Sequence, residues 1–305
     1  RFSDAKFFVE SDKKVSSKER NEKLKTVSYL KGMGNVFQRV KRIEAISEKI
    51  LNYLNDQSLD SKKIKEAAKY CKNDLCSEIV YEFPELQGIM GGKYLQNEGF
   101  SKEICLAVAE HYLPGFYKDD LPSTKYGAIV SISDKIETLI SIFISGKRPS
   151  GSSDPYALRR NLNGVILIIW QFELDLSLEN IFEELLEYWK ISLPNLNFIQ
   201  KKVFDDLIEF LLQRIESHLE EIGIDKEKEL LEMIYLAIAY FEDFVLPSLV
   251  KKVPSEEEKN ISQSKVLDPK KSNIDEWRAA GGIAFRVEDG NITPAIEGLK
   301  ELAFP

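Results

Sequence analysis

Residues 33–50 read Met33-Gly-Asn-Val-Phe-Gln-Arg-Val-Lys-Arg-Ile-Glu-Ala-Ile-Ser-Glu-Lys-Ile50, and their apolar side chains recur at intervals of three and four residues. This spacing places the apolar side chains on one face of an amphipathic helix. The stripe consists of Met33, Val36, Val40, Ile43, Ile46 and Ile50. Two more stripes have the same spacing, one of Ile64, Ala67, Cys71, Leu75 and Ile79, the other of Ile129, Ile132, Ile136, Leu139 and Phe143. The fold is predicted to be all-α.

Further helices are expected at 198–219 and 226–244, with Gly223 as a stop signal between them. The stretch 145–154 is rich in Gly, Ser and Pro and predicts a loop. Asp154 followed by Pro155 is typical of a helix start, because the carboxylate can cap free amides and proline has no amide to lose. The charged segment near 251–275 is predicted to be a linker.

The composition limits the classes of function. The chain has 305 residues and a net charge of −8, which argues against indiscriminate nucleic-acid binding. Residues 1–50 nevertheless carry 13 Lys and Arg against 7 Asp and Glu, so a local basic face could meet phosphate. No apolar run approaches the roughly 20 residues needed to span a membrane. The first residue is Arg rather than Met, which suggests a fragment or a processed chain.

Three cysteines and two histidines form no pattern of metal ligands. The cysteines, Cys71, Cys76 and Cys105, are predicted to be reduced thiols in a cytosolic type of compartment. No metal site and no phosphate-binding P-loop are expected.

Two motifs interrupt the helical pattern and are separated by 59 residues. The first is Tyr81-Glu-Phe-Pro-Glu-Leu-Gln-Gly-Ile-Met-Gly-Gly-Lys-Tyr94, and the second is Asp154-Pro-Tyr-Ala-Leu-Arg-Arg160. Shorter segments accompany them in order: 1–8, 33–36, 42–44, 110–112, 120–122 and 134–135. Together they resemble the beta subunit of the bacterial two-subunit glycyl-tRNA synthetase, over about residues 1–225. The segment 277–305 lacks the Lys-Arg-Val-x-Asn-Ile-like helix usual at the C-terminal end of that family.

The resemblance implies a degenerate HD-like helical domain at 1–195, then a smaller helical, anticodon-binding-like region at 196–305. It also implies a partner, the glycyl-tRNA synthetase alpha subunit or a fused equivalent, which holds ATP, Mg²⁺ and the glycine chemistry. This chain would bind glycine tRNA and contact the partner, and would carry no catalytic group or cofactor of its own. The expected location is the bacterial cytoplasm, or an organelle such as a plastid.

A metal-dependent HD-type phosphohydrolase is the alternative enzyme. Such a site needs a His-Asp pair among its ligands, because imidazole and carboxylate groups together hold metals that activate water. The matching position here reads Asn73-Asp74, and asparagine is a poor substitute for histidine. Asp134 could represent the last carboxylate, whereas His111 is expected to stabilise a helix end.

Cationic residues are the stronger functional candidates, because guanidinium groups pair with phosphate. The predicted tRNA contacts are Arg39, Arg42, Lys147, Arg148, Arg159 and Arg160. Adjacent arginines lie about 100° apart on a helix, so one of Arg159 and Arg160 is expected to face the protein. A purely structural helical scaffold is the remaining alternative, in which charge reversal at Arg159 and Arg160 would leave tRNA binding unchanged.

Overall fold

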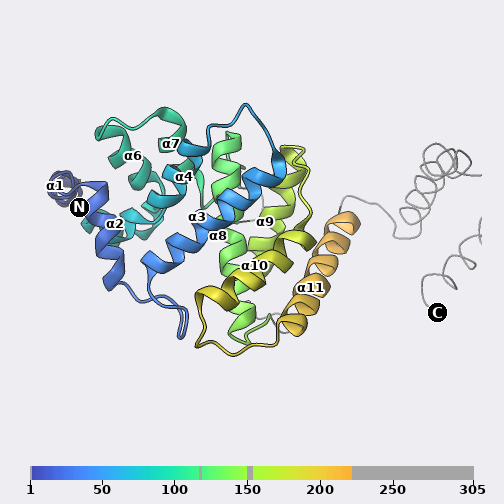
Figure 1. Cartoon of the computed structure of the whole chain (residues 1–305). Helices are drawn as coiled ribbons and strands as arrows, with labels where there is room; N and C mark the ends of the chain where they lie inside the picture. Colours follow the sequence, from blue (N-terminus) through green and yellow to red (C-terminus); the bar gives the residue numbers. More distant parts are fainter. Residues whose placement is uncertain (1, 117–118, 150–153, 222–305) are drawn as a thin grey trace, which may run out of the picture. The chain divides into compact units, whose positions relative to one another are not determined.

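The computed structural model describes residues 2–116, 119–149 and 154–221. These residues form helices joined by loops, and no strand occurs among them (Figure 1). The α-helices are α1 (Phe2–Asp12), α2 (Ser17–Lys23), α3 (Val36–Leu54), α4 (Ser61–Tyr70), α5 (Glu78–Glu82), α6 (Ile89–Asn97), α7 (Lys102–Glu110), α8 (Lys125–Ile144), α9 (Leu158–Gln171), α10 (Leu178–Ser192) and α11 (Gln200–Glu221). Short 3₁₀ helices cover Leu24–Thr26, Asn73–Cys76 and Pro84–Leu86. The all-α prediction is confirmed, whereas the HD-like character stays a prediction.

Helix α8 is the centre of the described part. It packs against α3, α4, α7, α9 and α11, and nearly all of its side chains are buried. The predicted stripe from Ile129 to Phe143 lies inside this core. Figure 1 shows α1 and α2 at one end of the described part and α11 at the other, with α3 and α8 between them. Polar side chains on α8 are therefore held inside the protein.

The predicted stripe from Ile64 to Ile79 is divided between two helices. Helix α4 ends at Tyr70, and α5 begins only at Glu78. The chain between them holds the buried Asp74, whose carboxylate accepts hydrogen bonds from the backbone amides of Gly88 (2.6 Å) and Gly91 (3.2 Å). These two hydrogen bonds hold the segment between α4 and α5 against the start of α6, in place of a continuous helix.

Helix α9 begins at Leu158 rather than at Pro155. Ala157 adopts a left-handed conformation with φ of 55°, which separates the expected cap residue from the first helical turn. The carboxylate of Asp154 still accepts the amides of Leu158 (2.8 Å) and Arg159 (2.9 Å). Asp154 therefore binds free amides of the first turn as expected, but the predicted start at Pro155 is wrong, because Ala157 is the N-cap residue.

The chain divides into two units, residues 1–225 and 226–305, and all of the described residues lie in the first unit. Helix α11 packs against α8, α9 and α10, so it shares their core. The division into a domain at 1–195 and a region at 196–305 stays a prediction. The predicted helix at 226–244, the linker near 251–275 and the segment 277–305 lie outside the described residues.

Candidate nucleic-acid interface

Two of the predicted tRNA contacts, Arg39 and Arg42, turn toward the core. Both donate from Nε to the carboxylate of Glu137 on α8, Arg39 at 3.0 Å and Arg42 at 2.9 Å. Arg39 also donates to Asp134 at 2.8 Å. Glu137 is fully buried and Arg42 is 4% exposed, so these guanidinium groups already have internal anionic partners. They are poorly placed to meet an external phosphate.

A second buried ion pair lies beside the first. The ammonium group of Lys72 donates to Asp134 at 2.7 Å and lies 3.7 Å from the ring centroid of Tyr112. Burial alone would raise the pKa of the Asp134 carboxyl, but Lys72 and Arg39 together hold this pKa below its usual range. Burial, reinforced by Lys72, lowers the pKa of His111 well below its ordinary value, so this imidazole is neutral.

The residues considered for an HD-type metal site are gathered here without forming a ligand set. Asn73 is fully buried, and neither polar atom of its side chain has a hydrogen-bond partner. The Nδ1 atom of His111 lies 2.6 Å from the carbonyl oxygen of Val108 and forms a hydrogen bond with it. Within the described ranges, no group of three His, Cys, Asp or Glu side chains is arranged to hold a metal. The phosphohydrolase alternative is not supported.

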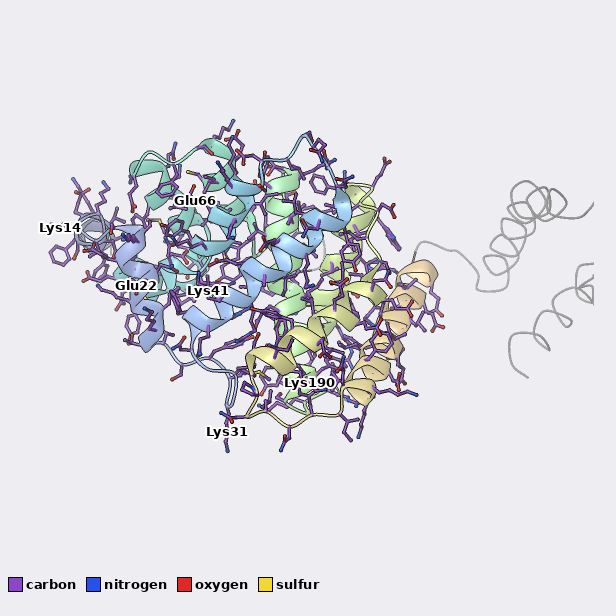
Figure 2. The ribbon with its side chains drawn as sticks, viewed as in Figure 1. Lys14, Glu22, Lys31, Lys41, Glu66 and Lys190 are labelled. Carbon is purple, nitrogen blue, oxygen red and sulfur yellow. The ribbon has the colours of Figure 1, made fainter. Side chains whose placement is uncertain are left out.

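Arginines and lysines of the basic first 50 residues are placed differently in the structure. The described arginines of this segment, Arg20, Arg39 and Arg42, are directed inward, and Arg20 is only 1% exposed. Lysines such as Lys14 and Lys31 extend from the surface (Figure 2). Among the described residues of this segment, the exposed positive charge is therefore carried mainly by lysine ammonium groups.

The other four predicted contacts lie around the end of α8 and the start of α9. We call Lys147, Arg148, Arg159 and Arg160 the α9 cationic face. Lys147 donates to the hydroxyl of Tyr156, and Arg148 forms an ion pair with Asp206 of α11. Arg160 is exposed, with its guanidinium carbon 5.1 Å from the ring centroid of Phe116. Arg159 is half-buried, as expected for one of two adjacent arginines.

A family model matches this chain over residues 1–230, and its description is glycyl-tRNA synthetase beta subunit. The match covers most of the described helices and both motifs. The chain belongs to the glycyl-tRNA synthetase beta subunit family.

Individual relatives agree with this assignment. The glycine–tRNA ligase beta subunit of Thermodesulfovibrio yellowstonii is 39% identical over 225 residues, which cover 74% of this chain and 31% of the relative. That of Trichodesmium erythraeum is 40% identical over 226 residues, with coverages of 74% and 31%. That of Natranaerobius thermophilus is 39% identical over 226 residues, with coverages of 73% and 32%. The chain thus spans about a third of the length of these relatives.

Sequence reasoning missed the partners of the α9 cationic face. Tyr156, Asp206 and Phe116 each contact one of its cations, yet they come from three different parts of the chain. Tyr156 and Phe116 each had a local signal. Tyr156 lies within the second motif, and Phe116 directly follows Pro114-Gly115, a dipeptide typical of loops. Asp206 had none, because it lies on a helix remote in sequence.

Proposed function

We propose that this chain supplies tRNA binding and subunit contacts to a glycine–tRNA ligase, which joins glycine to its tRNA with consumption of ATP. Family membership supports this proposal, and the α9 cationic face is the structural observation that carries it. The segment 145–162 contains four cationic residues and one acidic residue. The acidic residue, Asp154, is occupied in capping α9. Asp206 of α11 neutralises Arg148, but the four cations still outnumber these two carboxylates, and the positive excess favours an anionic partner such as an RNA backbone.

The proposed phosphate contacts differ in availability. Arg160 is exposed and interacts only loosely with an aromatic ring, and Lys147 is also exposed. Arg148 is 42% exposed on its side chain despite its ion pair with Asp206. Arg39 and Arg42 are not among the proposed phosphate contacts. If they turned outward to an RNA, the carboxylate of Glu137 would stay buried without a counter-charge.

The proposal assigns the reacting groups to the partner. ATP, Mg²⁺ and the activation of glycine belong to the alpha subunit or a fused equivalent, and this chain contributes no catalytic residue. The proposed location is the cytoplasm of a bacterium or the interior of an organelle such as a plastid. Within the described ranges, every helix is too short or too polar to cross a bilayer.

Binding to glycine tRNA, measured over a range of salt concentrations beside a non-cognate tRNA of equal length, tests this function. Each lost phosphate contact reduces the slope of log K against log salt by about 0.7 to 0.9. The double variant Lys147→Gln/Arg160→Gln is expected to bind more weakly and with a slope smaller by about 1.4 to 1.8.

The matched control is Lys14→Gln/Lys31→Gln, which removes two exposed charges that do not belong to the α9 cationic face. It should leave the slope nearly unchanged. An equal loss in both double variants would show that only net charge matters, and no loss in either would support the structural-scaffold alternative. Absence of tRNA binding by the unaltered chain at low salt would contradict the proposed function.

A further inference from the structure

Phe116 is a large apolar side chain that is 68% exposed in the loop between α7 and α8. The loop holds it on an anchored backbone. The amides of Gly115 and Phe116 both donate to one oxygen of Asp119, at 3.0 and 2.7 Å. At the base of the loop, the carbonyl oxygen of Leu113 accepts hydrogen bonds from Ser131 (2.6 Å) and from Lys135 (3.1 Å). The backbone amide of Phe116 is therefore hydrogen-bonded while its ring is presented to solvent.

Arg160 is brought to this ring by close packing between α9 and the base of the loop. A Cβ atom at Gly164, one turn after Arg160, would lie 3.2 Å from Pro114 and 2.8 Å from Lys135. The absence of a side chain at Gly164 leaves room for this close approach. The guanidinium of Arg160 then lies 5.1 Å from the Phe116 centroid, within the range of a cation–π contact.

A second cation lies beside an aromatic ring near the start of α9, where Tyr156 precedes Arg160 by four residues. The ammonium of Lys147 is 4.8 Å from the ring centroid of Tyr156 and donates to its hydroxyl. Two aromatic rings are thus each accompanied by a cation at the start of α9. Surfaces that bind single-stranded nucleic acid combine these two features, since cations follow the phosphates and aromatic faces stack on bases. Arginine and aromatic side chains also occur in protein–protein interfaces, but lysine is depleted there, so the exposed Lys147 favours a nucleic acid over a protein.

We propose that Phe116 stacks on an unpaired base of the bound tRNA, while Arg160 and Lys147 contact the adjoining phosphates. This inference rests on the proposed function and extends it from a charged surface to a specific aromatic contact. It also accounts for the exposure of a large apolar ring at Phe116.

The test compares Phe116→Ala, Phe116→Leu and Phe116→Trp in binding to glycine tRNA across salt concentrations. Phe116→Ala is expected to weaken binding about 5- to 150-fold, the usual range for one stacked base. The slope against salt should stay unchanged, because no charge is removed. Phe116→Leu should also bind tRNA more weakly, since leucine has no aromatic face. Phe116→Trp should bind tRNA about as well as the unaltered chain, because it keeps an aromatic ring. The matched control is Phe7→Ala, which removes a phenylalanine of nearly equal exposure (67%) on α1 and should have no effect.

The outcomes separate this inference from the function on which it rests. If the unaltered chain binds tRNA and Phe116→Ala binds equally well, the stacking contact is wrong and the proposed function stands. If the unaltered chain binds no tRNA at low salt, both fail. Full binding by Phe116→Leu would indicate a simple apolar contact and overturn stacking. Weaker association with the alpha subunit, at unchanged tRNA affinity, would show that Phe116 is a protein contact instead.

Discussion

Replacing Glu137 by glutamine should destabilise the folded protein strongly. The carboxylate of Glu137 accepts four hydrogen bonds, from Arg39 (3.0 Å), Arg42 (2.9 Å), Tyr29 (3.0 Å) and Ser141 (2.8 Å). Glutamine keeps a similar shape but removes the negative charge. Arg39 would retain Asp134, whereas Arg42 would lose its only ion-pair partner among the described residues.

The magnitude follows from burial. Glu137 is 0% exposed and the Arg42 side chain is 4% exposed, so the remaining guanidinium would be a buried charge without compensation. Breaking a buried ion pair from one side costs about 3 to 5 kcal/mol. Folded domains of this kind are stable by about 5 to 15 kcal/mol, so the loss is a large share of the total. For a unit of this size it corresponds to a decrease in Tm of about 6 to 20 °C.

Urea unfolding, followed by far-UV circular dichroism and tryptophan fluorescence, measures this change. The control is Glu184→Gln on α10, since Glu184 also binds a lysine and a tyrosine, Lys49 and Tyr53, but is 47% exposed. Exposed ion pairs contribute at most about 1 kcal/mol. A loss below 1 kcal/mol in Glu137→Gln, or equal losses in both variants, would refute the account of a buried charge cluster.

Two further predictions concern stability. Gly92→Ala should lower the free energy of unfolding by about 1 to 3 kcal/mol, because the added Cβ would lie 2.5 Å from a backbone carbonyl oxygen of α7. The control is Gly115→Ala, whose Cβ would have its nearest contact at 3.4 Å and which should be nearly neutral in the same urea assay. His111 is neutral when folded but takes up a proton below about pH 6.5 when unfolded, so stability should fall by about 1.4 kcal/mol per pH unit below that value. Lys72 and Arg39 hold the pKa of the neighbouring Asp134 below its usual range, so this carboxylate stays ionised in this window. The urea midpoint of His111→Gln should therefore depend less on pH between 5 and 6.5 than that of the unaltered protein. An equal dependence in both proteins would contradict a buried neutral imidazole.

The limits of sequence reasoning are clearest where a partner is distant along the chain. The stripe on α8 was predictable, because its spacing is a local property of the helix. The break after Tyr70 was not, because it depends on Asp74 reaching the amides of Gly88 and Gly91. The same limit applies to the site, where Arg160 was predicted but its neighbour Phe116 was not.

The sequence by itself determined the helical class, the order of the main helices and the family, because periodicity and motifs are written in consecutive residues. Only the tertiary structure decided which cations remain exposed and which are paired inside the protein. Arg39 and Arg42 look as suitable as Arg160 on the printed chain, yet their carboxylate partner, Glu137, lies 98 and 95 residues away. Pairing across that distance depends on how α3 packs on α8, because a charge is stable inside the core only beside its counter-charge.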